Sequence, residues 1–215
     1  MPFESAAAYL PRSRSLTSLR RAAAGCRGCD LYQNATQTVF GQGSRSARIV
    51  LVGEQPGDKE DVLGEPFVGP AGAMLESAIA KAGIDARLVY VTNAVKHFRF
   101  VVRGKRRIHQ KPRVIEIDAC RPWLDAEIAT LDARVIVAMG TTAARSVLGR
   151  SVRIGERRSK PLGVGDSRRV FVTIHPASIL RHPESGARHA AFERLVADLR
   201  AAAQMAFNVY APPAY

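Results

Sequence analysis

Four short, continuous runs of apolar residues constrain what this chain can fold into more than any other feature. Continuous runs, as opposed to alternating ones, are typical of strands buried on both faces of a parallel sheet. The predicted strands are residues 48–52, 88–92, 134–138 and 170–174, and helical spacing marks residues 70–82, 113–131, a segment ending near 149, and 187–206. Strands that alternate with helices predict an α/β fold with three layers, α/β/α, around a central, mostly parallel four-stranded sheet.

The length of 215 residues fits one domain with a substantial core. No internal repeat or long linker divides the chain, so we expect a single domain over residues 1–215 with its core at about 20–205. Residues 1–25 suggest an Ala/Arg-rich helix, and residues 151–169 suggest a hairpin or an irregular excursion. The last residues, 207–215, suggest a flexible tail.

Polar residues follow three of the four predicted strands. The segment Gly53-Glu54-Gln55-Pro56-Gly57-Asp58 follows the first strand, Asn93 follows the second, and His175 follows the last. Each is ordinary by itself: a strand-to-helix turn, a turn asparagine, and a histidine buried at a strand end. In a parallel sheet, however, ligands bind at the carboxyl ends of the strands. The three segments together therefore predict one functional site at this edge.

Residues 103–113 (Arg-Gly-Lys-Arg-Arg-Ile-His-Gln-Lys-Pro-Arg) form a strongly basic stretch. Six of these eleven residues are Arg or Lys, and His109 lies among them. Such charge without apolar periodicity predicts an exposed, phosphate-binding loop. Nearby cations disfavour a further positive charge, so we expect the pKa of His109 to be lowered and its imidazole to be neutral. A neutral imidazole can act as a base or a nucleophile, which phosphate binding alone does not require.

The whole chain is basic as well, with a net charge of +13 and a pI near 10.5. A polyanionic partner follows from this charge. We expect nucleic acid and not a membrane, because no strongly apolar amphipathic helix accompanies the charge and no stretch approaches membrane-spanning length. The alternative is a generally basic composition without a specific partner.

Three cysteines, Cys26, Cys29 and Cys120, cannot all pair within one chain. The first residues lack the basic start and long apolar run of a signal peptide, so we expect a reducing, cytoplasmic location. The cysteines are then better interpreted as metal ligands or free thiols than as disulfides. Taken alone, Cys26-Arg-Gly-Cys29 suggests zinc or a redox pair.

Four segments, taken together, resemble a known family. They are Gly-Glu-Gln-Pro-Gly at 53–57, Pro-Phe-Val-Gly-Pro-Ala-Gly at 66–72, Val-Thr-Asn-Ala-Val-Lys at 91–96 and His-Pro-Ala-Ser-Ile-Leu-Arg at 175–181. In order and at compatible spacing over roughly residues 20–200, they resemble the uracil-DNA glycosylase superfamily, and within it the iron–sulfur group (family 4). The resemblance implies a uracil-DNA glycosylase-like fold.

Two departures from that group narrow the resemblance. Gln55 stands where the group usually has Ala, and the basic segment Lys105-Arg106-Arg107-Ile108-His109 is foreign to its ordinary members. Both features resemble the UdgX-type proteins of the superfamily, in which a histidine of this loop becomes covalently joined to DNA.

The resemblance also implies a cofactor. Cys26, Cys29 and Cys120 match three ligands of a [4Fe–4S] cluster, and His97 falls where the fourth cysteine is expected. Imidazole can replace thiolate on iron, so His97 is the implied fourth ligand. A zinc site with three cysteines and one histidine remains the alternative from the residues alone.

The family implies roles in a pocket for a flipped uracil. Phe67 stacks on the base, Asn93 reads its O4 and N3–H, and His175 stabilises the negative charge on the departing uracil. The region of Gln55 supplies backbone and side-chain hydrogen bonds. The remaining residues implied to bind the base are Gly53, Gly57 and Asp58.

The same resemblance implies roles in covalent chemistry and DNA binding. His109 attacks C1′ of the sugar, and Glu54 orients it and accepts its proton, with Asp58 as the less favoured acid. The residues implied to bind DNA are Lys105, Arg106, Arg107, Ser178 and Arg181. The expected protein is a monomer that excises uracil from DNA, preferably single-stranded, releases free uracil and stays linked through His109.

Three other functions remain open. An ordinary glycosylase would turn over and leave His109 incidental, and a non-catalytic module would bind nucleic acid without excising anything. A hydrolase of small nucleotides is more distant, because it would not need a charge of +13.

Overall fold

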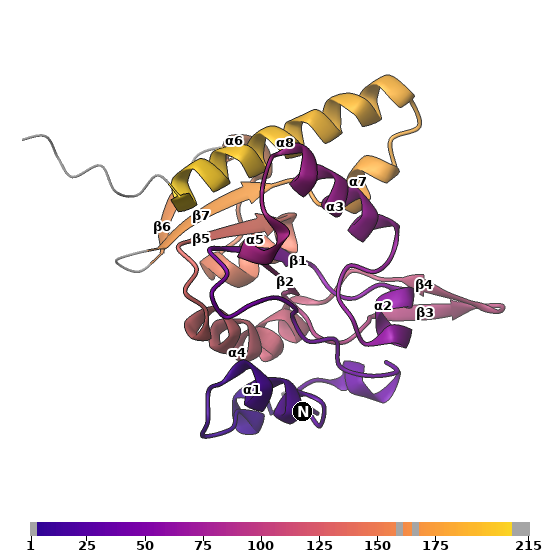
Figure 1. The fold of residues 1–215 in the computed structure, drawn as a ribbon. Helices are drawn as coiled ribbons and strands as arrows, with labels where there is room; N and C mark the ends of the chain where they lie inside the picture. The colour runs from indigo at the N-terminus through magenta and orange to yellow at the C-terminus, as the bar shows by residue number, and fades with distance from the viewer. Residues whose placement is uncertain (1–3, 158–160, 165–167, 208–215) are drawn as a thin grey trace, which may run out of the picture.

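The central sheet of this computed structural model contains five strands in the order β2-β1-β5-β7-β6. The structure describes residues 4–157, 161–164 and 168–207. The four predicted strands are confirmed as mutually parallel, and a short antiparallel strand, β6, pairs with β7 at the edge (Figure 1). The bounds are β1 Ile49–Gly53, β2 Val89–Asn93, β5 Val135–Met139, β6 Leu162–Val164 and β7 Arg168–Thr173. The prediction of four strands missed β6, whose three residues carry no apolar run.

Helices cover both faces of the sheet. Successive side chains of β1 point to opposite faces, so Ile49 and Leu51 belong to one hydrophobic cluster while Val50 and Val52 belong to another. The first cluster includes α3 Pro70–Lys81, α7 Pro176–Leu180 and α8 Ser185–Phe207, and the second includes α4 Val114–Thr130 and α5 Thr141–Leu148. Figure 1 shows α8 above the sheet and α4 below it. The expected three-layer α/β/α fold is confirmed.

The N-terminal segment packs on the outer side of α4 and forms a third hydrophobic cluster around Trp123. It contains the short helices η1 Ala6–Tyr9, α1 Leu16–Ala23 and η2 Asp30–Gln33. One helix over residues 1–25 was the expectation, and only eight of the described residues there form an α-helix. Pro11 and the N-cap serine Ser15, whose side chain accepts the N–H of Ser18, separate the helical pieces.

The predicted exposed loop at 103–113 is instead an exposed β-hairpin in its first half. Strand β3 Phe100–Arg103 pairs with β4 Arg106–His109 and the pair projects from the body of the molecule (Figure 1). The turn has two central residues, and the first of them, Gly104, has a φ of 58°. A glycine at this position suits a type II′ turn, whose twist matches that of a hairpin. The loop prediction was wrong because the pairing partner, Phe100–Arg103, lies mostly outside the charged window.

The remaining elements are short: α2 Asp58–Leu63, η3 Ala86–Leu88 and α6 Ile154–Arg157. The predicted excursion at 151–169 contains α6 and β6 in its described part, and the predicted tail from 208 lies outside the described residues. Among the helices that the structure describes, none has the length and apolar composition to cross a membrane.

Candidate functional site

The predicted polar residues converge at the carboxyl ends of the strands. Strand β1 lies between β2 and β5, so the strand order reverses beside it, which is where ligands bind in open α/β sheets. A pocket of about 340 Å³ opens at this edge. Of the predicted site residues, Gln55, Gly57, Asp58, Phe67, Asn93, His109 and His175 line it. The structure therefore brings the three predicted segments together at one edge of the sheet, while their roles stay a prediction.

Gly53 ends β1 directly opposite Asn93 of β2 and leaves room for two side chains. A Cβ atom on Gly53 would lie 2.3 Å from Oδ1 of Asn93 and 2.7 Å from the ring of Phe67. Asn93 is 3 % exposed, and within the described part of the chain its carboxamide makes no hydrogen bond. Its donor and its acceptor are both available to a ligand.

The backbone of Phe67 is in the left-handed region, with a φ of 59°. This conformation is uncommon for an aromatic residue and costs about 1–3 kcal/mol, so surrounding structure has to hold it. A Cβ atom on Gly72 of α3 would overlap the carbonyl of Phe67, so the helix approaches this loop closely only because residue 72 is glycine. The Phe67 ring is stacked toward His175 at 6.4 Å between centroids. Both rings form part of the pocket lining.

His175 caps helix α7, and this contact fixes its tautomer. Its Nδ1 accepts the backbone N–H of Ala177 at 3.1 Å, which leaves the ring proton on Nε2. The pKa of His175 is lowered to about 4, first by burial and then by the neighbouring Arg181 and His109, which disfavour a further positive charge. At neutral pH the ring is uncharged and can donate one hydrogen bond from Nε2.

His109 is the last residue of β4, and its imidazole Nε2 lies 3.5 Å from Oε1 of Glu54. About half of its side-chain surface (49 %) remains exposed. Its pKa is lowered, mainly by burial of the other half and also by Arg181, while Glu54 acts in the opposite direction. The expected lowering is confirmed, but the expected cause is not: the cation that lowers this pKa is Arg181 and not a residue of the hairpin.

Glu54 is the acid nearest to His109, and a second contact holds it. The hydroxyl of Thr142, in the first turn of α5, donates a hydrogen bond to Oε2 of Glu54. Asp58 is engaged elsewhere, because its Oδ1 accepts Nε of Arg107 at 2.5 Å. The contacts therefore favour Glu54 over Asp58 as the partner of the imidazole.

The Gln55 side chain holds the base of the hairpin. Its Nε2 donates to the backbone carbonyls of Arg99 at 3.1 Å and Gln110 at 3.0 Å, and its Oε1 accepts the N–H of Arg99 at 3.1 Å. Arg99 precedes β3 and Gln110 follows β4, so one buried carboxamide joins both ends of the hairpin. Its side chain is thus occupied by protein groups, whereas the expectation gave its hydrogen bonds to the base.

Arg107 holds the hairpin against α2. Its guanidinium contacts Asp58 and, at 2.6 Å, the fully buried carboxylate of Asp61, and it lies over the rings of Phe98 and Phe100. The two preceding cations of the basic segment differ from it, because Lys105 and Arg106 are exposed at the hairpin tip. Of the three hairpin residues predicted to bind phosphate, Lys105 and Arg106 are therefore the two whose side chains are open to solvent.

A second hollow, of about 670 Å³, adjoins the pocket. Gln55, His109, His175 and Ala177 line both spaces, and the second is completed by Glu54, the Gly140–Thr141 turn, Ser178 and Arg181. The Ser178 hydroxyl donates to the carbonyl of His175 at 2.6 Å. His109 and His175 therefore stand at the boundary between a narrow pocket and a wider cleft.

The family model described as the uracil DNA glycosylase superfamily matches residues 40–200, which contain this whole site. The chain belongs to the uracil-DNA glycosylase superfamily. The type-4 uracil-DNA glycosylase of Thermotoga maritima is 36 % identical over 169 residues, covering 78 % of this chain and 84 % of the relative. The type-4 enzymes of Archaeoglobus fulgidus and Pyrobaculum aerophilum are 33 % and 31 % identical over 177 and 175 residues, covering 79 % and 78 % of this chain and 85 % and 86 % of theirs.

The fold expected of a uracil-DNA glycosylase superfamily member is thus confirmed, and its three cysteines are all buried. Cys26, Cys29 and Cys120 all belong to the hydrophobic cluster around Trp123. The indole N–H of Trp123 donates to Sγ of Cys26 at 3.2 Å, and the backbone N–H of Lys96 donates to Sγ of Cys120 at 3.2 Å. The pKa of Cys120 is raised to about 12, first by burial and also by the neighbouring thiols.

His97 is 5 % exposed and follows Lys96 directly. Burial lowers its pKa to about 4, so its ring is a neutral donor. In the described parts of the chain, however, no group of three or more His, Cys, Asp or Glu side chains is arranged to hold a metal ion. The types and burial of the four donors suit an iron–sulfur cluster, while their arrangement does not by itself form a metal site, so the cluster stays a prediction.

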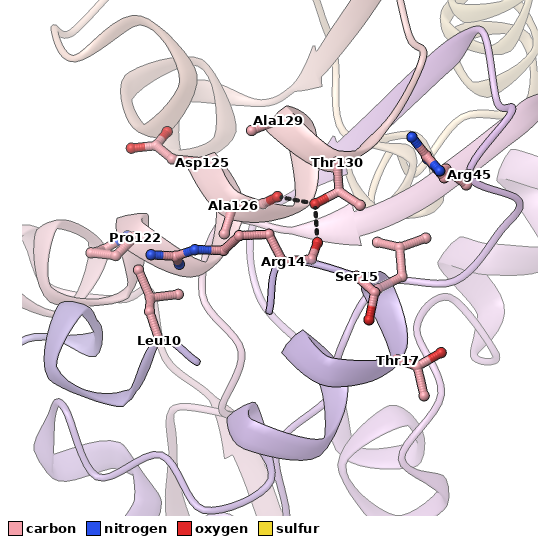
Figure 2. Close-up of a pocket in the computed structure, with 11 residues that line it drawn as sticks. Leu10, Arg14, Ser15, Thr17, Arg45, Pro122, Asp125, Ala126, Ala129 and Thr130 are labelled. Carbon is pink, nitrogen blue, oxygen red and sulfur yellow. Dashed lines mark hydrogen bonds between the residues drawn. The ribbon is translucent and has the colours of Figure 1, made fainter. Parts of the chain in front are cut away.

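A larger hollow, of about 1030 Å³, lies between α1 and α4 and contains none of the predicted site residues. Its lining includes Leu10, Arg14, Arg45 and the exposed side of α4 from Pro122 to Thr130 (Figure 2). Figure 2 shows the Thr130 hydroxyl hydrogen-bonded to the backbone oxygens of Arg14 and Ala126. This hollow is open and lies away from the residues that resemble the superfamily motifs, so the site is assigned to the smaller pocket.

Sequence reasoning missed several residues that hold the site together. The carboxylate of Glu60 accepts the N–H groups of Gly57 and Gly69 and so joins the two glycine-rich loops. Its spacing from Gly57 is that of a helix N-cap and the third helical residue, a signal that was available. Thr142, which contacts Glu54, and Asp61, which contacts Arg107, depend on contacts distant in sequence and carry no such signal.

Proposed function

We propose that this protein excises uracil from DNA and that His109 then bonds to the sugar carbon that uracil has left. The observation that carries the proposal is the position of His109 at the boundary of the two hollows, 3.5 Å from Glu54. A base in the narrow pocket would have its sugar and phosphates in the wider cleft, with the imidazole beside the bond between them. Membership of the superfamily and the named type-4 relatives support the glycosylase part of the proposal.

The first step is entry of a flipped nucleotide. Unstacking costs a few kcal/mol, and least when the DNA is single-stranded, which favours a single-stranded substrate. Phe67 offers a ring on which the base stacks, a contact worth about 1–3 kcal/mol. The free carboxamide of Asn93 accepts from N3–H and donates to O4 of uracil. Cytosine presents the reversed pattern and leaves both groups unpaired, which is the basis of its rejection.

The second step is cleavage of the glycosidic bond. The bonding electron pair leaves with uracil, whose developing negative charge is spread over its carbonyl oxygens. His175, neutral and with its proton on Nε2, donates a hydrogen bond to that charge. The sugar becomes an oxocarbenium-like electrophile at C1′.

The third step forms the new bond. A neutral imidazole has one ring nitrogen with a free lone pair, and that pair forms the C–N bond to C1′. The ring is then positively charged until the proton on its other nitrogen is lost, and Glu54 is the carboxylate that stabilises this charge and accepts the proton. The C–N bond between His109 and C1′ is stable because no further neighbouring proton acceptor is available to promote its cleavage.

We further propose that Cys26, Cys29, Cys120 and His97 hold a [4Fe–4S] cluster with a structural role. Two observations support this proposal. The three thiols are buried in one hydrophobic cluster. Trp123 and Lys96 donate hydrogen bonds to two of the sulfur atoms, and such bonds tune the reduction potential of a cluster. Iron and acid-labile sulfide analysis of purified protein tests it. Zinc without sulfide would establish the alternative site.

A denaturing gel tests the main proposal. Protein mixed with uracil-containing single-stranded DNA should give a band of protein plus DNA that survives SDS and heat, together with one equivalent of free uracil. His109→Ser should lose the band while it still releases uracil, because water can then reach C1′. A heat-stable band with His109→Ser would exclude His109 as the nucleophile.

Two other results would identify the competing functions. Free uracil in excess of the protein, without any stable band, indicates an ordinary turnover glycosylase. Salt-sensitive DNA binding with no preference for uracil and no release indicates a non-catalytic binding module.

A further inference from the structure

Lys96 and Glu127 form a buried ion pair next to Asn93, and the proposed reaction gives this pair no role. Lys96 and Glu127 both have fully buried side chains, and the ammonium lies 2.5 Å from Oε2 of Glu127. Lys96 follows β2, and Glu127 belongs to α4 on one face of the sheet. Neither residue lines the narrow pocket or the wider cleft. A charge pair buried this completely calls for a physical explanation.

All three protons of the ammonium are used. Besides Glu127, Nζ of Lys96 donates to Oγ1 of Thr92 at 2.6 Å and to the backbone carbonyl oxygen of Asn93 at 2.8 Å. Thr92 and Asn93 are the last two residues of β2. The charged group thus holds the backbone of the residue whose carboxamide points into the pocket. Hydrogen bonds from a charged donor are about twice as strong as neutral ones.

The carboxylate is held as firmly as the ammonium. Glu127 accepts hydrogen bonds from the hydroxyls of Tyr90 and Thr92 and, at 2.8 Å, from the backbone N–H of Gly41. A Cβ atom on Gly41 would lie 2.5 Å from Oε1 of Glu127, so that the contact requires glycine there. The pair therefore links α4, which carries Glu127, to strand β2 and to the backbone of Gly41.

Stability alone does not account for such a pair. Removing two charges from water is costly, and apolar residues of similar volume often stabilise a protein as well or better. What apolar residues cannot supply is a directed bond to the carbonyl of Asn93. That bond fixes the peptide plane after Asn93, and with it the direction of the Cα–Cβ bond that carries the carboxamide. A displacement of about 1 Å at a reacting site can cost a hundredfold in rate.

We infer that Lys96 and Glu127 are positioning residues that aim the carboxamide of Asn93 at the base in the pocket. Neither touches the substrate, and both act through the backbone of Asn93. The inference rests on the proposed function, because it takes the ligand of Asn93 to be a uracil base. Lys96, which follows β2, and Glu127 of α4 would then determine specificity without contacting the base.

A double-mutant cycle with Asn93 tests this inference. Glu127 is the better side to change, because the backbone of Lys96 also contacts Cys120. Glu127→Gln keeps the shape and removes the charge. Under single-turnover conditions with uracil-containing single-stranded DNA, it should lower the rate constant of uracil release about tenfold and leave the half-saturating DNA concentration unchanged. In the Asn93→Ala background, Glu127→Gln should have no further effect.

Asp198→Asn is a matched control for the loss of a buried carboxylate. Asp198 is 1 % exposed and accepts the hydroxyl of Thr173 at 2.5 Å, on the α8 side of the sheet. Asp198→Asn should change the rate constant by the same factor in the parent protein and in the Asn93→Ala background. If Glu127→Gln does not fold, Thr92→Val replaces it in the cycle, because it removes the hydroxyl that bridges both charges and keeps the side-chain shape.

Two results would overturn the inference. Equal loss of rate from Glu127→Gln in both backgrounds would assign the pair to stability, and an unchanged rate in the parent background would leave it without influence on Asn93. If the unaltered protein neither releases uracil nor forms the heat-stable band, the proposed function fails first and this inference fails with it. Release by the unaltered protein with no coupling in the cycle rejects the positioning role alone.

Discussion

At the scale of single residues, the chemistry depends on the charge state of His109. Three influences act on its pKa: burial lowers it most, Glu54 raises it, and Arg181 lowers it. The net result lies below the ordinary value of 6.5. The nucleophile is the deprotonated, neutral ring, so a lowered pKa extends the active form to more acidic solution.

The first prediction therefore concerns two substitutions with opposite signs. Arg181→Gln removes a cation and should raise the pKa of His109, so that protonation begins at higher pH. Glu54→Gln removes an anion and should lower it further. Titration of the His109 ring by NMR in the DNA-free protein, with His109→Ser used to assign its signal, measures both shifts. In the unaltered protein the midpoint should lie below 6.5.

The same titration decides between the two candidate acids. A midpoint that stays fixed in Glu54→Gln and falls in Asp58→Asn would transfer the role of Glu54 to Asp58. We expect the opposite, because Arg107 already neutralises Asp58 while Glu54 faces the imidazole.

The neutrality of His109 also illustrates what sequence can and cannot predict for a residue. The sequence predicted a lowered pKa correctly, but from the cations next to His109 in the chain. In the structure Arg107 is neutralised by Asp58 and Asp61, and the effective cation, Arg181, comes from the end of α7. Charges act through space, and a single sequence gives the residue types without the distances. For the same reason, the sequence alone left both Glu54 and Asp58 as candidates for the acid that contacts His109.

At the scale of elements, the β3–β4 hairpin is attached to the body of the protein by a few polar contacts. Gln55 joins its two ends at the base, and Arg107 joins β4 to α2. Its valines Val101 and Val102 are 41 % and 67 % exposed, so their burial contributes little to holding it. The position of His109 at its end thus depends on these polar anchors.

The second prediction tests the anchor at the base. Gln55→Ala removes three hydrogen bonds, each worth about 0.5–1.5 kcal/mol net, and leaves the base-sized pocket open. The hairpin should become more mobile, so we expect less heat-stable adduct and more free uracil per protein, as water competes with His109. Adduct and uracil are quantified in the same reaction. Gln42→Ala, an exposed glutamine, is the control and should behave as the parent.

Unchanged adduct yield in Gln55→Ala would mean that bound DNA, and not Gln55, holds the hairpin in its working position. A joint loss of adduct and uracil would instead assign Gln55 to contact with the base, which was the expectation from sequence.

The third prediction compares two adjacent arginines of the hairpin. Arg106→Ala removes an exposed cation and should weaken DNA binding, lowering the slope of log affinity against log salt by about one, without a change in Tm. Arg107→Ala leaves the buried carboxylate of Asp61 without its cation and should cost about 3 kcal/mol of stability. Salt titration of DNA binding and thermal unfolding distinguish the two variants. Equal salt slopes and equal Tm values for both would contradict the separate roles.

Elements differed in how well sequence predicted them. The four parallel strands carry continuous apolar runs and were found within one or two residues of their observed bounds. The hairpin was missed because β3 lies mostly outside the charged segment, and because the contacts of Gln55 and Arg107 that hold the hairpin leave no periodic pattern. Helices α2 and α7 have six and five residues and are too short for a helical period to be visible.

At the scale of the whole molecule, three hydrophobic clusters are stacked in sequence: one on each face of the sheet and a third beyond α4. The third joins the N-terminal segment to α4 and contains all three cysteines. Two of them, Cys26 and Cys29, come from the segment, and Cys120 comes from the helix. A cluster of iron and sulfide bound by these thiols would therefore connect the two parts covalently.

The last prediction follows from this arrangement and concerns removal of the proposed cluster. Chelation of iron should release the N-terminal segment, because the packing around Trp123 is then its main attachment to α4. Hydrogen exchange should show faster exchange in residues 15–40, while β1 and β5 in the middle of the sheet retain their protection. The Cys26→Ser/Cys29→Ser double variant should reproduce the pattern without a chelator. Faster exchange throughout the sheet would mean that the cluster supports the entire fold, and no change in residues 15–40 would mean that apolar packing alone holds the segment.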